Sequence, residues 1–168
     1  MNTNINKSEI RLEVATVPGL ELRSASQTDL ENLRTWKNKE KQYFFYQEEI
    51  SKELQLNWFE SFKLRPDDFM FMTVFEGHVF GCMGIRWQKD FWDVYNVIVG
   101  LPEFSGRGFM RHSFATMLAH ALSIKKAPIT LEVLKNNPAV SWYQKQGFVI
   151  IETHENYFKM LFKSNELI

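Results

Sequence analysis

The sequence predicts a single domain of the α+β class, and three observations lead to that prediction. The chain has 168 residues, which fits one domain of about 100–200 residues. Two apolar runs, at 69–75 and 79–87, are continuous, as in central strands buried on both faces. Other segments carry apolar residues at intervals of three and four, which is typical of amphipathic helices.

The N-terminal part predicts two short strands and two helices. The strands, at 9–14 and 20–24, flank the turn pair Pro18-Gly19. Thr28 and Glu31 have the spacing of a capping box, so the first helix is expected to start there. A second helix is expected from about Ser51, and its apolar residues fall at intervals of four on one face: Ile50, Leu54, Trp58 and Phe62.

The rest of the chain predicts four more strands and two more helices beyond the continuous runs. Strands are expected at 94–99, 129–134, 149–151 and 157–162. A periodic helix is expected at 109–122 and a short one at 138–146, where Pro138 suits the first turn and Gly147 the end. We expect residues 1–8 to form a flexible tail and residues 9–168 to form the domain.

The composition excludes several classes of function. With 20 basic and 20 acidic side chains the formal net charge is zero, whereas nucleic-acid binding requires a basic excess or stripe. A single cysteine excludes a disulfide framework and a four-thiolate metal site. His112 and His120 have no partners at metal-ligand spacing, so no metal is expected. No apolar stretch approaches the roughly 20 residues of a membrane span, so we expect a cytoplasmic protein with no nucleic-acid or membrane partner.

The segment from Val97 to Met110 has the form of a strand, a glycine-containing loop and a helix. In this arrangement the amides of the loop and the first helical turn point one way, and the helix dipole adds positive potential, so an anion can bind. The spacing of Gly106 and Gly108 fits neither a Walker loop nor a dinucleotide fingerprint. By itself the spacing favours an ordinary connection between a strand and a helix over an anion site.

A second motif gives the segment a more specific meaning. Asn136 is followed by Ala139, then by Tyr143, and then by the pair Gly147-Phe148. Together with the glycine loop upstream, this pattern resembles the GCN5-related N-acetyltransferase (GNAT) superfamily, and the resemblance covers nearly the whole chain after about residue 20. It implies a mixed, mostly antiparallel central sheet with splayed strands, flanked by about four helices.

The resemblance implies that acetyl-CoA is the co-substrate and lies along the strand at 94–99. Backbone groups of Val97, Ile98 and Val99 would bind its pantetheine arm. The loop would hold its pyrophosphate through Ser105, Gly106, Arg107, Gly108, Phe109 and Met110. Two of these positions depart from the family pattern, because Ser105 replaces a long polar residue and Met110 replaces a small one. Cradling by backbone amides does not depend on side chains, so it is expected to survive both changes.

The resemblance also implies the catalytic residues. Tyr143 matches a tyrosine that protonates the departing CoA thiolate as a general acid, and Asn136 matches an asparagine that contacts the cofactor. The alternatives are an aromatic residue at the edge of the core and a residue at a helix N-terminus, respectively. An acceptor ammonium must lose a proton before it attacks the thioester. We expect Glu132 to accept that proton, with Asp93, His78, His154 and a water relay as alternatives.

Acceptor choice is expected to depend on the N-terminal half. The motifs Trp36-Lys37-Asn38 and Asn57-Trp58-Phe59 resemble the branch of the superfamily that includes nucleotide-linked amino-sugar and ribosomal-protein acetyltransferases. The expected substrate contacts are Trp36, Asn38, Phe45, Tyr46 and Tyr95. Four aromatic residues occupy positions 43–46; they can stack on sugar rings or a nucleobase, or they can seal the core, as expected for at least two of them.

These observations predict an acetyl-CoA-dependent N-acetyltransferase that transfers an acetyl group directly to a primary amine of a small molecule. The leading acceptor is an amino sugar, nucleotide-linked ones included. The alternatives are a peptide or protein N-terminal acetyltransferase and a non-catalytic acyl-CoA-binding module. A homodimer is one assembly open to the chain.

Overall fold

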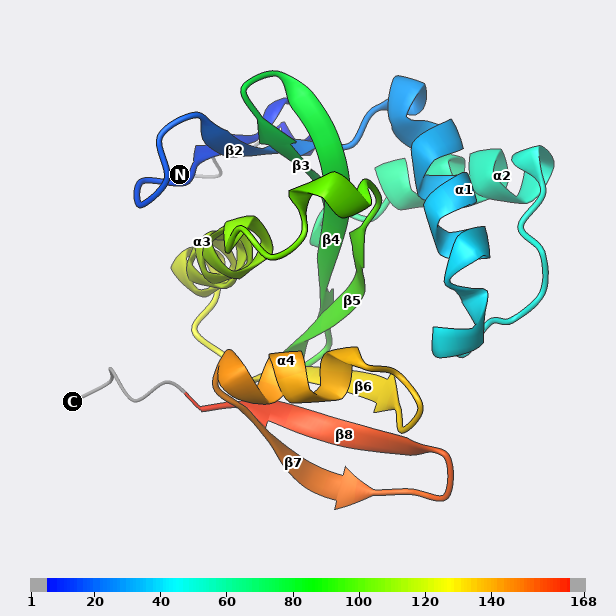
Figure 1. Cartoon of the computed structure of the whole chain (residues 1–168), viewed down its shortest axis with the longest axis vertical. Helices are drawn as coiled ribbons and strands as arrows, with labels where there is room; N and C mark the ends of the chain where they lie inside the picture. The colour runs from blue at the N-terminus through cyan, green and yellow to red at the C-terminus, as the bar shows by residue number, and fades with distance from the viewer. Residues whose placement is uncertain (1–5, 164–168) are drawn as a thin grey trace.

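The computed structural model describes residues 6–163 and contains one eight-stranded sheet with four α-helices (Figure 1). The strands are β1 Arg11–Glu13, β2 Leu20–Ser24, β3 Asp68–Phe75, β4 His78–Gln88, β5 Phe91–Val99, β6 Ile129–Leu134, β7 Phe148–Thr153 and β8 Tyr157–Phe162. The helices are α1 Leu30–Lys39, α2 Lys52–Lys63, α3 Phe109–Ile124 and α4 Ala139–Lys145. Short 3-10 turns are η1 Lys7–Glu9, η2 Gln27–Asp29, η3 Lys41–Tyr43 and η4 Pro102–Phe104. The predicted fold class is confirmed.

The sheet is mixed and splayed, as the family resemblance implies. Its strand order is β1-β2-β3-β4-β5-β6-β8-β7, and every neighbouring pair is antiparallel except β5 and β6. These two parallel strands pair only at Trp92 with Ile129 and at Asp93 with Thr130. Beyond Asp93 they separate, so the last six residues of β5 have a sheet neighbour on one side alone.

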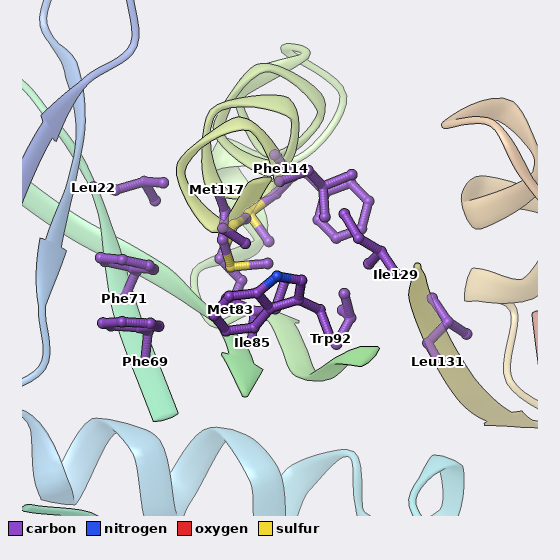
Figure 2. Close-up of a cluster of buried hydrophobic side chains, with 14 of the residues drawn as sticks. Leu22, Phe69, Phe71, Met83, Ile85, Trp92, Phe114, Met117, Ile129 and Leu131 are labelled. Carbon is purple, nitrogen blue, oxygen red and sulfur yellow. The ribbon is translucent and has the colours of Figure 1, made fainter. Parts of the chain in front are cut away.

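Two hydrophobic clusters cover opposite faces of the strands that precede this split. Helix α3 packs on one face through Phe114 and Met117, which are buried against Trp92 and Ile129 (Figure 2). Helices α1 and α2 lie on the other side of β4 and β5 (Figure 1), where Leu33, Trp36, Phe59 and Phe62 pack against Met70, Met72 and Ile98. Because β3 and β4 are covered on both faces, their sequences are continuous apolar runs instead of alternating ones.

The start of α1 differs from the prediction by one short turn. The capping box is formed by Ser26 and Asp29 and not by Thr28 and Glu31. Asp29 accepts a hydrogen bond from the Ser26 amide at 2.8 Å and two from the guanidinium of Arg23 at 2.8 and 2.9 Å. The turn η2 therefore precedes α1 because the buried Asp29 needs Arg23 of β2, a tertiary contact that local spacing does not reveal.

Helix α2 begins as predicted, but the face that it buries is different. Ser51 caps the helix by accepting a hydrogen bond from the Leu54 amide at 3.1 Å. The buried residues are Gln55, Phe59 and Phe62, whereas Leu54 is 47% exposed. Leu54 and Trp58, from the predicted stripe, instead line a hollow between the helix and the sheet.

Part of the predicted N-terminal tail is structured. Lys7 and Ser8 belong to η1, and residues 1–5 lie outside the described part of the chain. The Lys7 ammonium donates hydrogen bonds to the carbonyls of Phe62, Arg65 and Asp68 at 2.8, 2.6 and 2.7 Å. The cation thus satisfies carbonyls at and just beyond the end of α2, so the segment at 6–9 is fixed to the domain. No helix within residues 6–163 is long and apolar enough to cross a membrane.

We predict that Asp29→Asn lowers the free energy of unfolding by about 2 kcal/mol at pH 7, because it weakens charge-assisted hydrogen bonds in a buried position. Burial acts to raise the Asp29 pKa, but the hydrogen bonds from Arg23 and Ser26 outweigh it and hold the pKa below its ordinary value of 3.8. The contribution of the carboxylate is therefore complete above that ordinary value and is lost as the pH falls through the lower folded-state pKa.

Urea unfolding of both forms between pH 2 and 7 measures this difference. Asp90→Asn, at an exposed turn position, is the matched control. A gap between wild type and Asp29→Asn that persists unchanged at the lowest pH would contradict the prediction.

Candidate active site

Three cavities with shared walls lie around the end of β5. The β5 cavity, of about 410 Å³, is lined by Val97, Ile98 and Val99 together with residues of α4 and of the connection between α1 and α2. The polar cavity, of about 340 Å³, contains Tyr143, Glu132 and Asp93. The apolar cavity, of about 320 Å³, lies between α1, α2 and the sheet. Tyr43, Phe44 and Asn137 line both the β5 and the polar cavity, so the two adjoin.

A β-bulge in β5 stands where these cavities meet. Cys82 of β4 is opposite Ile98, but Gly84 is opposite Tyr95, so β5 contains one extra residue in this interval. Asn96 takes up the irregularity with φ at +49°, in the left-handed region that asparagine tolerates better than most residues. The bulge directs Asn96 to the polar and apolar cavities and leaves Val97 and Val99 on the β5 cavity.

The loop before α3 offers its backbone, because its larger side chains are engaged elsewhere. Phe109 is buried, with its ring 4.3 Å from that of Phe75, and Met110 is buried between the core and the β5 cavity. The Arg107 guanidinium lies 4.5 Å from the Phe109 ring centre, on the outer side. Gly106 and Gly108 have φ of +74° and +78°, and Gly108 precedes the first residue of α3. The first amides of α3 have no partner within the helix, so the loop presents backbone donors that can bind an anion.

The Met110 substitution therefore does not obstruct the loop. Its side chain points inward, where its sulfur would lie 3.5 Å from a Cβ placed on Gly81. Ser105, the other departure from the family pattern, is exposed and lines the β5 cavity. Both changes leave the backbone of the loop accessible.

Tyr143 lies on α4 with its ring in the core and lines the polar cavity. Its ring packs against those of Phe114, Trp142 and Phe148, and the residue is 7% exposed. Burial raises the pKa of Tyr143 well above that of an ordinary phenol. The hydroxyl therefore keeps its proton throughout the physiological range and can act as a donor but not as a base.

Two carboxylates and one arginine face the same cavity. Asp93 accepts a hydrogen bond from Nε of Arg86 at 3.0 Å. Burial raises the pKa of Asp93, with smaller additions from the charges of Glu132 and Asp68, although Arg86 acts in the opposite direction. Glu132 is exposed on β6 and has no ion-pair partner within residues 6–163. The cavity therefore holds one paired and one unpaired carboxylate.

The connection between α1 and α2 forms the opposite wall. Phe45 and Tyr46 are 54% and 48% exposed and line the polar cavity, whereas Phe44 packs against the core. Of the four aromatic residues at 43–46, Phe44 is the one that packs against a hydrophobic cluster, where at least two were expected to seal the core. Phe45 and Tyr46, both expected to contact the substrate, are exposed. Asn136 and Asn137 fix this wall, since their amide nitrogens donate to the carbonyls of Gln42 and Tyr43 at 3.2 and 3.4 Å.

The other predicted site residues have more varied positions. Tyr95 lines the polar cavity, with its hydroxyl donating to Asp68 and its ring 4.5 Å from the Arg86 guanidinium carbon. Asn136 is exposed, and its neighbour Asn137 is the one that lines the cavities. Trp36 and Asn38 line none of the three cavities.

Trp36 and Asn38 instead make structural contacts with Gly100 and Ile50. Trp36 is buried against Gly100, where a Cβ would lie 2.0 Å from the indole ring. Asn38 uses both ends of its amide on Ile50, accepting from the backbone amide at 2.8 Å and donating to the carbonyl at 3.0 Å. Trp36 therefore packs α1 against the end of β5, and Asn38 fixes the end of the connection between α1 and α2.

Lys37 is not among the site residues predicted from the sequence, yet it lines both the polar and the apolar cavity. It lies four residues after Leu33, so the helical period places it on the buried face of α1. A lysine in an apolar stripe is the signal that could have identified it. Within residues 6–163 no group of three or more potential metal ligands is present.

Comparison with known families gives the class of this protein. Residues 30–148, more than half of the chain, match the family model described as the acetyltransferase (GNAT) family. The chain belongs to this family and is an acetyltransferase that uses acetyl-CoA. No curated protein sequence matches the chain.

Solved structures share the fold at low sequence identity. FdhC, a nucleotide-linked sugar GNAT, superposes with a TM-score of 0.74 and 17% identity over 92% of this chain and 90% of its own. The ribosomal α-N-protein acetyltransferase RimL in complex with coenzyme A superposes with a TM-score of 0.72 and 15% identity, over 90% of this chain and 96% of its own. Spermidine N-acetyltransferase from Vibrio cholerae, in complex with CoA and spermine, superposes with a TM-score of 0.70 and 20% identity, over 86% of this chain and 95% of its own.

We predict that Gly108→Ala lowers the free energy of unfolding by about 1 kcal/mol and weakens CoA binding by about tenfold. The added Cβ finds ordinary space, 3.7 Å from the nearest His112 atom, but the positive φ strains the loop that presents the amides. Calorimetric titration with CoA and urea unfolding measure the two effects. Gly77→Ala is the matched control, because Gly77 has φ of +81° and lies in the turn between β3 and β4. If both variants keep wild-type affinity for CoA, the loop does not hold the cofactor.

Proposed function

We propose that this enzyme transfers the acetyl group of acetyl-CoA directly to a primary amine of a small molecule, and that amino sugars, nucleotide-linked ones included, are its leading acceptor class. The observation that carries the proposal is the common cavity of Tyr143, Glu132 and Asp93, which adjoins the cavity beside the splayed half of β5. A proton donor and proton acceptors thus face the space next to the strand that would bind the pantetheine arm.

The chemistry follows from these roles. Glu132 accepts a proton from the acceptor ammonium, and the neutral nitrogen then attacks the thioester carbonyl carbon. A C–N bond forms and the C–S bond breaks. Tyr143 donates its proton to the departing sulfur, which leaves as the CoA thiol. The nitrogen loses its second proton as the amide forms, and a proton returns through solvent to the Tyr143 phenolate, while Glu132 releases its own proton to solvent. Asp93 accepts a hydrogen bond from Arg86, and its negative charge lies in the same cavity as that of Glu132.

The walls of the polar cavity support a sugar acceptor. The exposed rings of Phe45 and Tyr46 can stack on the apolar face of a sugar, while carboxylates and phenol hydroxyls can bind its hydroxyl groups. The likeness of the fold to FdhC agrees with this class. A peptide or protein N-terminus is the second candidate, because the likeness to RimL is of similar quality.

The test is CoA release from acetyl-CoA in the presence of amino sugars, sugar-nucleotide amines and short peptides with free N-termini. Turnover with the sugars supports the proposal, and turnover with peptides alone supports the second candidate. If acetyl-CoA raises the melting temperature but no amine yields CoA, the chain is a non-catalytic acyl-CoA-binding module.

We predict that Tyr143→Phe lowers kcat by about 100-fold, the usual contribution of a positioned general acid, with little change in KM for acetyl-CoA. Within residues 6–163 the hydroxyl makes no hydrogen bond to the protein, so the melting temperature is expected to remain near that of the wild type. Steady-state kinetics across pH 6–9 measure the effect. Full turnover of the variant over this range would contradict the role of Tyr143.

We predict that Glu132→Gln lowers kcat by about 100-fold through loss of the base, and that Asp93→Asn lowers it less. The distinction rests on Arg86, which engages Asp93 and leaves Glu132 as the unpaired carboxylate. Both variants are isosteric, so the same kinetic assay compares them directly. A larger loss in Asp93→Asn than in Glu132→Gln would assign the proton transfer to Asp93.

A further inference from the structure

We infer that Lys37 binds an anionic group, a phosphate or a carboxylate, on the acceptor. The inference rests on the proposed function, because it concerns the acceptor side of the same site. It makes Lys37 a specificity-determining residue and narrows the acceptor to a molecule that carries both an amine and an anion.

The position of Lys37 is unusual for a lysine. It lies on the inward face of α1, where it lines the polar and the apolar cavity at once. Its ammonium is 5.2 Å from the centre of the Phe44 ring, and no carboxylate within residues 6–163 lies in ion-pair distance. Burial lowers the pKa of Lys37, and the nearby charge of Arg86 lowers it further.

A largely buried ammonium without an anion is costly for a folded protein. Proteins place most lysines so that the charge reaches water, yet this side chain enters a cavity that opens on the proposed reaction centre. The cost is relieved if the acceptor itself supplies the anion. Lys37 as a residue is half-buried and lines the polar cavity, so a ligand in that cavity contacts its side chain.

The other charges of the polar cavity support this assignment. Four of its lining side chains are charged: Lys37, Arg86, Asp93 and Glu132. Arg86 and Asp93 form an ion pair with each other at 3.0 Å, so the described part of the cavity presents one unpaired cation and one unpaired anion. An acceptor whose amine approaches Glu132 and whose anion approaches Lys37 satisfies both.

This charge pattern disfavours polycationic acceptors. Glu132 can pair with one ammonium of a polyamine, but the further ammonium groups meet the unpaired cation Lys37, and like charges in a partly buried site repel. An amino-sugar phosphate or an amino acid brings one ammonium together with an anion. The chain is therefore expected to differ in specificity from the spermidine acetyltransferase that shares its fold.

The test is calorimetric binding to the full chain saturated with CoA, with two matched pairs of probes. Glucosamine 1-phosphate against glucosamine tests a phosphate, and phenylalanine against phenethylamine tests a carboxylate. We expect the anionic member of at least one pair to bind about tenfold tighter or more, and the pair that shows the preference identifies the source of the anion. Spermidine is expected to bind more weakly than either anionic probe.

Lys37→Met is expected to abolish the preference and to raise the melting temperature, because it removes the unpaired charge. Lys37→Gln provides the same binding comparison if the methionine variant does not fold. Lys39→Met, at an exposed position two residues along α1, is the control and should bind like the wild type. Equal binding within both pairs, or a preference that survives both Lys37 variants, would overturn the inference.

The CoA-release assay on the same probes separates this inference from the proposed function. If neutral and anionic amines are acetylated equally well, the enzyme activity stands and the role of Lys37 fails. If the anionic probes bind through Lys37 but no amine yields CoA, the anion site stands and the proposed transfer fails.

Discussion

The early end of the pairing between β5 and β6 is the constraint on which the site depends. Two residue pairs join these parallel strands, and beyond Asp93 their backbones diverge. An unpaired strand edge must find other hydrogen-bond partners, and here the bulge at Asn96 and the adjoining cavities make it available to a ligand. The same divergence leaves room for Tyr143 of α4 to line one cavity with residues of β5, so the free strand edge and the position of the phenol have one structural origin.

The two faces of the sheet differ in how completely their helices pack against it. On one face α3 and the cluster around Trp92 and Phe114 form a tightly packed core that fixes the loop after β5. On the other face α1 and α2 pack less completely and leave the apolar cavity between themselves and Met70 and Ile98. A cavity forfeits packing energy, so this face contributes less to stability than the face covered by α3.

The formal net charge of zero does not reveal how charges are distributed within the site. Arg86 and Asp93 neutralise each other, while Lys37 and Glu132 have no ion-pair partner among residues 6–163. Charges in such a partly buried cavity interact more strongly than at the surface. A neutral protein thus contains a dipolar pocket. The Arg107 guanidinium lies over the rings of Phe75, Phe104 and Phe109, so the groups that the loop before α3 offers to an anion are its backbone amides.

The sequence by itself determined the fold class, most element positions and the motifs at 97–110 and 136–148, because hydrophobic period, glycine placement and motif spacing are local properties. Tertiary structure decided the rest. Asn38 and Trp36 became framework residues because Ile50 and Gly100 lie against them, and the stripe of α2 faces a cavity because the sheet does not fill it. The role of Lys37 emerges only when α1 is docked on β4 and β5, since the absence of a partner is a property of three-dimensional surroundings and not of spacing along the chain.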